Sequence, residues 1–419
     1  MQLRSYDGDY FPSFFTIQLD TNVFSDNFSP CQSSTCIHEY IHFIQDLILP
    51  YCIRTNLSYI RLFNNVCKYA KEHNKIDIPF TYWDSDEFDL KQQFDFTFGS
   101  GKAKKISISD ISISEKYKFS GFDQHNKCNR NLTVYKYKIN FINGSSYHLG
   151  ARDLLEYIAY RIESKHFNIG SDVPDYPYKT IDILFDYLGH SKLSVEKRIM
   201  IAEICLYNDN PIHFLFNVII DKGLIKEIIH VPVNKFADLL YKKLATQSVD
   251  GIVETFSKKE ERRLNDFLTQ LSTVYRHSDL LIKWITSVND FSRKKFQGAL
   301  IFTNLYRMKN DEFKVAIREM SDALGFPIVI NMDEKILNNI NLSDSSIDDL
   351  KYFYMVERFI NFTEKNILPS KKCPIGNFCK QNYKITCDKK FEVDKSSNCP
   401  FLEFLKINHI DGIQFQKNK

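Results

Sequence analysis

The sequence predicts an α+β protein that is predominantly α-helical, and three observations lead to this fold class. Between residues 149 and 368, apolar residues recur at the three- and four-residue spacing of amphipathic helices. Residues 84–148 instead form short alternating runs, such as KKISISDISIS, broken by Gly, Asn and Ser, as is typical of β-hairpins. From residue 369 on, the chain is rich in Cys and Lys and has little periodicity.

These observations divide the chain into five parts. The first contains a predicted strand at 14–20 and a helix at 33–50, which ends at Pro50. FPIVINM at 326–332 predicts one further strand within the later helical region. The predicted parts are 1–83 with the N-terminal strand and helix, 84–148 as a β-rich insert, 149–220 and 221–368 as two helical parts, and 369–419 as a small Cys-rich C-terminal module.

The composition narrows the class of protein. A hydrophobic fraction of 43% is enough for a sizeable core. With 55 basic and 52 acidic residues, the net charge of +3 does not favour nucleic acid or an anionic membrane as a partner. No apolar run is long enough to span a bilayer, and the N-terminus lacks the pattern of a secretory signal. Ten cysteines are too few for a disulfide-rich secreted scaffold, so we expect a cytoplasmic protein.

The segment SSTCIHEYIHFIQDLILP, residues 33–50, concentrates ionisable side chains on a helix that otherwise has a buried pattern. His38 and His42 are four residues apart, so both imidazoles lie on one face and can bind the same ion. Glu39 lies beside them, where its carboxylate would reach a water molecule on the ion rather than the ion itself. Four isoleucines would fix the helix against a core: Ile37, Ile41, Ile44 and Ile48.

The string His38-Glu39-x-x-His42 resembles the H-E-x-x-H signature of zincin metallopeptidases. The resemblance implies a zinc ion held by the two histidines, with Glu39 as general base in the hydrolysis of a peptide bond. It also implies a zincin-like catalytic core. The alternative interpretation is an ordinary helix whose histidines form local hydrogen bonds.

A catalytic zinc ion usually has three protein ligands, so a third must come from elsewhere in the chain. The metzincin pattern is not met, because Gln45 and Ile48 occupy the positions of its glycine and its third histidine. The similarity is therefore to the gluzincins, which implies that a glutamate from a later helix is the third ligand.

Glu156, in LGARDLLEYIAYRIE, is the leading candidate for this ligand. Ala159, one turn further on, is small enough to let its helix approach the zinc helix, and the E-x-x-A spacing resembles gluzincin ligand helices. The alternative third ligand is Glu203 in IMIAEICLY, because a carboxylate in so apolar a run needs a partner or a metal ion. Either glutamate could instead be structural, Glu156 as a solvated residue and Glu203 as a paired core residue.

Zinc peptidases commonly use a Tyr, His or Arg to donate a hydrogen bond to the oxyanion of the reaction intermediate. Tyr147, His148 and Tyr160 are candidates, because they lie close to Glu156 in the sequence. Gln45 and Asp46 are expected to lie on the polar face of the zinc helix, with a role as partners of the ligands as the alternative.

Four cysteines fall in the last part of the chain: Cys373, Cys379, Cys387 and Cys399. Their clustering in a short, core-poor segment predicts a second, structural zinc ion held by four thiolates. An iron-sulfur cluster uses the same donors, and two disulfides or unconnected thiols are further alternatives. The lysines here would also suit docking of a protein or nucleic acid, but aromatic residues are not interleaved with them.

We therefore expect a cytoplasmic zinc metallopeptidase of gluzincin-like, bacterial type that cleaves a protein or peptide substrate. It could be a gated effector of a bacterial defence or antiviral conflict system, with the helical region as a surface for an activating or sensing partner. The alternative is a non-catalytic interaction protein whose zinc sites are purely structural.

Overall fold

The computed structural model places most of the chain. It describes residues 3–4, 8–20, 34–82, 94–99, 101–104, 106–123, 128–167, 173–220, 224–235, 245–247, 253–274, 278–296, 300–325, 327–336, 344–364, 373–383 and 399–417. The helices are α1 (Ser34–Ile48), α2 (Pro50–His73), α4 (Ala151–His166), α5 (Thr180–Tyr187), α6 (Val195–Cys205), α7 (Pro211–Phe214), the π-helix η2 (Leu215–Ile220), α8 (Leu224–His230), α10 (Phe256–Val274), α11 (Ser278–Phe296), α12 (Ile301–Arg307), α13 (Asn310–Leu324), α14 (Asp344–Glu364), α15 (Gly376–Tyr383) and α16 (Pro400–Ile407). The strands are β1 (Leu3–Arg4), β2 (Gly8–Phe11), β3 (Thr16–Leu19), β4 (Lys75–Ile78), β5 (Ile108–Asp123), β6 (Cys128–Phe141), β7 (Ser146–Leu149), β8 (Ala245–Gln247), β9 (Val253–Thr255), β10 (Ile328–Asn331) and β11 (Gln414–Lys417).

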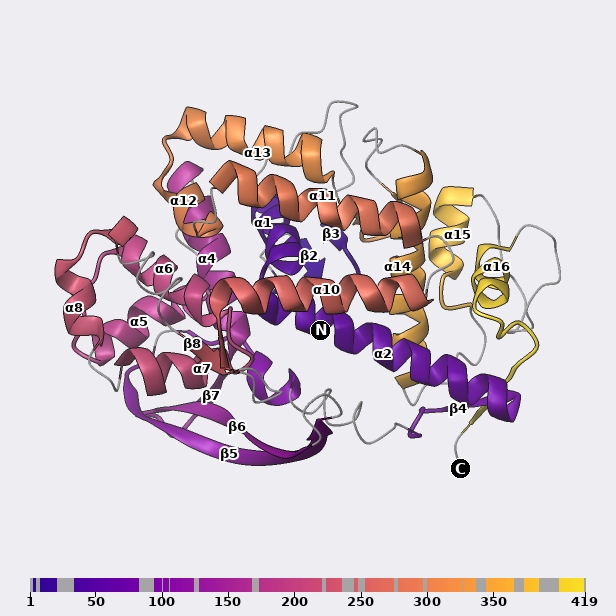
Figure 1. Ribbon diagram of the computed structural model, residues 1–419, viewed down its shortest axis with the longest axis horizontal. Helices are drawn as coiled ribbons and strands as arrows, with labels where there is room; N and C mark the ends of the chain where they lie inside the picture. The colour runs from indigo at the N-terminus through magenta and orange to yellow at the C-terminus, as the bar shows by residue number, and fades with distance from the viewer. Residues whose placement is uncertain are drawn as a thin grey trace.

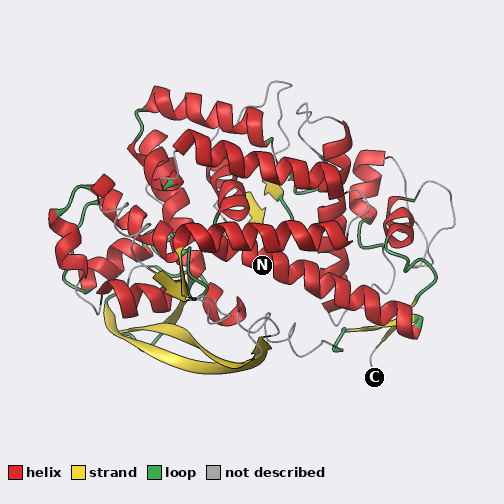
Figure 2. Ribbon diagram, viewed as in Figure 1, coloured by secondary structure: helices red, strands yellow, loops and turns green. Residues whose placement is uncertain are grey.

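Helices make up most of the molecule, and the strands form small separate sheets, as in an α+β protein (Figure 2). Helix α1 and the strands β2 and β3 lie near the centre, surrounded by longer helices, whereas β5 and β6 form a curved hairpin at one edge (Figure 1). Among the described helices, none combines the length and the apolar character needed to cross a bilayer. The predicted fold class, α+β and predominantly helical, is thus confirmed, and the zincin-like core stays a prediction.

A four-stranded sheet in the order β1-β2-β3-β10 packs beside α1. The N-terminal strands pair antiparallel, whereas β10 pairs parallel to β3 with Ile328 opposite Thr16. The predicted strands at 14–20 and 326–332 are therefore both present. No local pattern predicts that the two strands are neighbours, because their pairing joins two distant parts of the chain.

The strands β5, β6 and β7 form a second, antiparallel sheet and fall within or next to the predicted β-rich insert. Strand β7 leads directly into α4 through Gly150. The preceding segment 94–99 also passes this point, and a Cβ atom on Gly150 would lie 2.2 Å from the backbone nitrogen of Gly99. Only glycine fits at 150, because the two backbones touch at the start of α4.

Helices α1 and α4 pack against each other. Ala159 on α4 is fully buried, and its small side chain permits this approach. Every residue of α1 from Cys36 to Ile48 is buried, including the four predicted isoleucines. The expectation that Gln45 and Asp46 form a polar face is wrong, because both side chains are buried, at 1% and 2% exposed.

The described part of the predicted C-terminal module packs on the main core. Strand β11 pairs parallel with β4, and Phe404 of α16 lies with its ring centroid 5.7 Å from that of Phe63 in α2. The C-terminal helices and β11 are thereby connected to the N-terminal part of the chain.

Candidate metal centre

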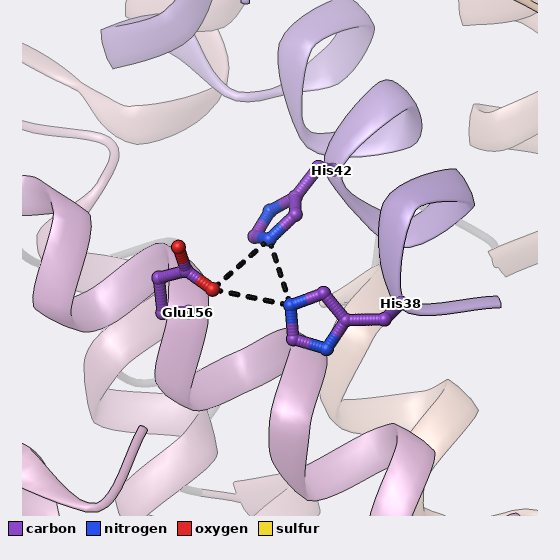
Figure 3. Close-up of side chains that lie close together, drawn as sticks. All are labelled: His38, His42 and Glu156. Atoms are coloured by element: carbon purple, nitrogen blue, oxygen red, sulfur yellow. Dashed lines mark hydrogen bonds and ion pairs between the residues drawn. The ribbon is translucent and has the colours of Figure 1, made fainter. Parts of the chain in front are cut away.

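Three side chains from α1 and α4 converge on one point inside the protein. Nε2 of His38 lies 3.1 Å from Nε2 of His42 and 3.1 Å from Oε2 of Glu156, and the third side of this triangle, from His42 to Glu156, is 3.3 Å (Figure 3). All three residues are at most 1% exposed. Among the residues that the structure describes, this is the one group of His, Cys, Asp and Glu ligand atoms close enough to hold a metal ion.

The spacing of the three atoms fits a metal ion. Ligand atoms about 2.1 Å from a tetrahedral ion lie about 3.4 Å from one another, by simple geometry from typical zinc–ligand distances. The distances of 3.1 to 3.3 Å between the three atoms are close to this value. The structure therefore brings together the two predicted histidines and the leading candidate for the third ligand.

Each histidine is oriented by a partner on its outer nitrogen. Nδ1–H of His38 donates to Oε2 of Glu163 at 2.9 Å, and Nδ1–H of His42 donates to Oε1 of Gln45 at 2.7 Å. Gln45 donates in turn from Nε2 to the carbonyl oxygen of Leu155, which fixes its amide orientation. Because both Nδ1 atoms donate outward, both Nε2 atoms face the centre and are the nitrogens that could bind an ion, as in ligand histidines of metal sites.

The pKa values of the three side chains depend on one another. Burial lowers the pKa of His38, but its hydrogen bonds to Glu156 and Glu163 outweigh this effect and raise its pKa well above the usual value. Burial lowers the pKa of His42. The pKa of Glu156 lies well below its usual range, because the two imidazoles outweigh the effect of burial. Binding of a metal ion at this centre would therefore displace a proton from His38.

The charges around the centre also favour a divalent cation. Glu39, Glu156 and Glu163 are buried carboxylates, and Nε of Arg152 in α4 lies 3.7 Å from Oε1 of Glu156. Once an ion has displaced the proton of His38, these three carboxylates and this guanidinium together carry two negative charges in excess. A buried charge excess is costly, and a divalent cation at the centre would cancel it.

Glu39 is fully buried and adjacent to the centre on α1. Its negative charge contributes to the raised pKa of His38 and of Tyr178. It does not belong to the group of three ligand atoms. Its role as the general base stays a prediction.

The alternative prediction, that Glu203 is the third ligand, is wrong. Its carboxylate accepts hydrogen bonds from the backbone N–H groups of Phe302 and Thr303 and from the hydroxyl of Thr303, at 2.7 to 3.1 Å. It therefore binds the N-terminal end of α12 instead of the centre. The apolar run around Glu203 indicated correctly that the carboxylate needs a partner, but the partner is a helix end.

The three predicted oxyanion donors do not contact the ligand group in the described structure. The Tyr147 hydroxyl donates to Asp153 at 2.8 Å, and His148 lies in β7 opposite Lys138. The ring centroid of Tyr160 lies 5.8 Å from that of Tyr178. Two other tyrosines lie beside the centre: the ring centroid of Tyr178 is 5.8 Å from that of His38, and the ring centroid of Tyr10 is 6.3 Å from that of His42.

Several residues around the centre were missed in the sequence. Arg152 and Glu163 precede and follow Glu156 by one and two turns, so helical spacing could have indicated both. Gln45 is not among the missed residues, because its hydrogen bond to His42 confirms the alternative role as a partner of the ligands. Tyr178 lies in the segment between α4 and α5, where no periodic pattern predicts its position. Burial raises the pKa of Tyr178, as do the nearby charges of Glu156 and Glu39, so its hydroxyl keeps its proton.

The predicted four-thiolate site is only partly described. Cys373, Cys379 and Cys399 lie within the described residues, and no group of close metal ligands that includes them is found there. Cys387 lies outside the described residues. The second zinc ion and the iron-sulfur alternative thus stay predictions.

No family model, no curated protein and no solved structure matches this chain.

Proposed function

We propose that this chain is a zinc-dependent metallopeptidase of gluzincin-like type, with His38, His42 and Glu156 as the ligands. The observation that carries the proposal is the spacing of the three ligand atoms, 3.1 to 3.3 Å, in a fully buried site. A structural zinc site usually has four protein ligands, whereas a catalytic site has three and one open position. Three ligands beside an uncoordinated glutamate favour a hydrolytic centre.

A divalent ion at this centre would lower the pKa of a water molecule towards about 7 and polarise the substrate carbonyl. Glu39 would take the proton from the attacking water and pass it to the leaving amine. The Tyr178 hydroxyl would donate a hydrogen bond to the oxyanion, because it stays protonated and its ring lies against His38. Glu163 and Gln45 would keep the two imidazoles in place.

Two histidines and one carboxylate also bind iron(II) in oxygen-dependent enzymes. Glu39 favours hydrolysis over that chemistry, because a buried carboxylate next to the ligand His38 is suited to accept a proton from water. Metal analysis of the purified protein separates the two, since zinc and iron are measured independently.

The burial of the centre supports a gated enzyme. Its two histidines, Glu39 and Glu156 are all at most 1% exposed, so a protein substrate must gain access through a conformational change. We therefore propose a cytoplasmic effector of a bacterial defence or conflict system that an activating partner opens. Toxicity on expression that disappears with Glu39→Gln would support this role.

The central experiment compares wild type with Glu39→Gln and His38→Ala. We expect one zinc ion per chain in wild type and in Glu39→Gln, and loss of zinc in His38→Ala, as measured by plasma mass spectrometry. Because the centre is buried, wild type should cleave a mixed peptide library only when denaturant loosens the fold, and this cleavage should be lost in both variants. Glu72→Gln is the matched control, because it makes the same change at an exposed position of α2 and should behave as wild type.

Two results would contradict the proposal in different ways. If wild type binds no divalent metal after loading, the metal centre is wrong. If Glu39→Gln cleaves peptides as well as wild type, Glu39 is not the general base. If the protein binds zinc but cleaves no peptide, even when denaturant has loosened the fold, the alternative of an interaction protein with a structural zinc site is favoured.

A further inference from the structure

Two buried polar atoms face each other behind the metal centre. Nε of Arg152 lies 3.7 Å from Oε1 of Glu156, one turn further along α4. Neither atom forms a hydrogen bond within the described structure, although Arg152 is only 7% exposed and Glu156 is fully buried. Such unpaired buried groups are rare in folded proteins and call for an explanation.

The two oxygens of Glu156 have different surroundings. Oε2 is turned to the two imidazoles, 3.1 Å from His38 and 3.3 Å from His42. Oε1 is turned to the guanidinium of Arg152. A carboxylate can bind an ion through one oxygen or through both, so the group next to Oε1 affects which of the two occurs.

Arg152 is held in place from its other side. Its Nη1 donates to the carbonyl oxygen of Gly101 at 2.9 Å. Gly101 has a φ of +96°, a conformation that favours glycine. The guanidinium therefore lies between the carbonyl of Gly101 and the carboxylate of Glu156, with little freedom to leave.

We propose that Arg152 is a positioning residue that holds Oε1 of Glu156, so that this carboxylate offers a metal ion only Oε2. The inference rests on the metal centre of the proposed function. One oxygen from Glu156 and one nitrogen from each histidine leave a coordination position for water, which a hydrolytic centre needs. Without the guanidinium, Oε1 can turn to the ion and occupy that position.

The hydrogen bond from Arg152 to Gly101 also connects this part of the chain to α4. A structural role of this kind is the alternative explanation for Arg152. The two roles differ in what they predict for a bound ion. A structural role affects stability but leaves the coordination of the ion unchanged, whereas the positioning role changes the coordination number.

The test uses the full chain loaded with Co²⁺, whose visible absorption reports coordination number. Tetrahedral cobalt lacks a centre of symmetry and absorbs strongly, and a higher coordination number weakens the bands. We expect Arg152→Met to bind one Co²⁺ with weakened visible bands, and Arg152→Lys to restore part of the intensity. Arg161→Met is the matched control on the same helix, since Arg161 pairs with Asp182, and its spectrum should equal that of wild type.

Arg152→Gln keeps a donor for Gly101 without the positive charge and decides the matter if Arg152→Met does not fold, as judged by circular dichroism. An unchanged cobalt spectrum in a folded Arg152→Met or Arg152→Gln protein overturns the inference alone, while the metal centre stands. Failure of wild type to bind Co²⁺ overturns the metal centre and the inference together.

Discussion

His38 is held between two carboxylates of the same helix. Glu156 contacts its Nε2 and Glu163 its Nδ1, and the two glutamates are seven residues apart, which places them on one face of α4. The ring can therefore rotate neither toward solvent nor away from His42. The contacts with Glu156 and Glu163 thus keep Nε2 of His38 pointed at the centre, where an ion would bind.

Replacing Glu163 with glutamine should weaken metal binding without removing a ligand. Partners of ligand histidines typically contribute about 10- to 100-fold to metal affinity, so we expect a loss in this range. Competition with a chelating dye measures it directly. Glu72→Gln on the exposed face of α2 should leave the affinity unchanged, and equal affinities of Glu163→Gln and wild type would show that the contact between Glu163 and His38 is unimportant.

How far the sequence predicts the centre can be seen residue by residue. His38, Glu39 and His42 are close in the chain, so helical geometry alone relates them. Glu156 could be proposed because Ala159 indicated a close helix contact. Glu203 was a wrong alternative, because an isolated carboxylate in an apolar run looks the same whether it binds an ion or a helix end. Tyr178 reaches the centre only through the path of a loop, which no local pattern describes.

At the scale of elements, the end of α6 and the start of α12 are joined by the buried carboxylate of Glu203. Burial raises the pKa of Glu203 to about 7, although the hydrogen bonds from Thr303 and Phe302 act in the opposite direction. The folded protein therefore keeps a proton that the unfolded chain releases between about pH 4.5 and pH 7. The free energy of unfolding should fall as pH rises through this window.

The variant Glu203→Gln should remove this part of the pH dependence. The shift corresponds to roughly 3 kcal/mol at most between pH 5 and pH 8, since one pKa unit corresponds to about 1.4 kcal/mol. Urea unfolding of both proteins at the two pH values measures the difference. Asp46 and Asp153 are also buried with raised pKa values, so the comparison with wild type, and not the absolute slope, is decisive. If the free energy of unfolding changed equally between the two pH values in wild type and in Glu203→Gln, the raised pKa could not belong to Glu203.

The crossing of the segment at Gly99 over the start of α4 makes Gly150 irreplaceable. Gly150→Ala would place a methyl group 2.2 Å from the backbone nitrogen of Gly99, where no side chain can move aside. We expect a loss of about 2–3 kcal/mol or more in the free energy of unfolding, as measured in urea. Gly412→Ala is the control, because nothing lies within 4 Å of its Cβ position. Similar stability of the two variants would contradict the close crossing.

At the scale of the molecule, a bound ion would link α1 to α4 and thereby stabilise the folded state as a whole. An ion at about 100 times its dissociation constant stabilises the folded protein by about 2.7 kcal/mol. We expect removal of the ion with a chelator to lower the melting temperature, as followed by calorimetry. The melting temperature of His42→Ala should not respond to the chelator, and a wild-type protein that does not respond would contradict the link.

At the scale of the whole molecule, local sequence patterns predict less of the fold. The helical spacing predicted the helical majority, and alternation predicted the hairpin of β5 and β6, because both patterns are local. The partners β3 with β10 and β4 with β11 come from distant parts of the chain. Their pairing depends on how the intervening helices pack, and no single segment encodes it.

The parallel pairing of β3 with β10 has a consequence for synthesis. During translation, the strand Thr16–Leu19 leaves the ribosome long before Ile328–Asn331 is made. Its unpaired edge is then available to other nascent chains or to chaperones until β10 has been synthesised. A chain arrested before residue 328 should therefore aggregate, or stay bound to a chaperone, even though both histidines and Glu156 are already in place.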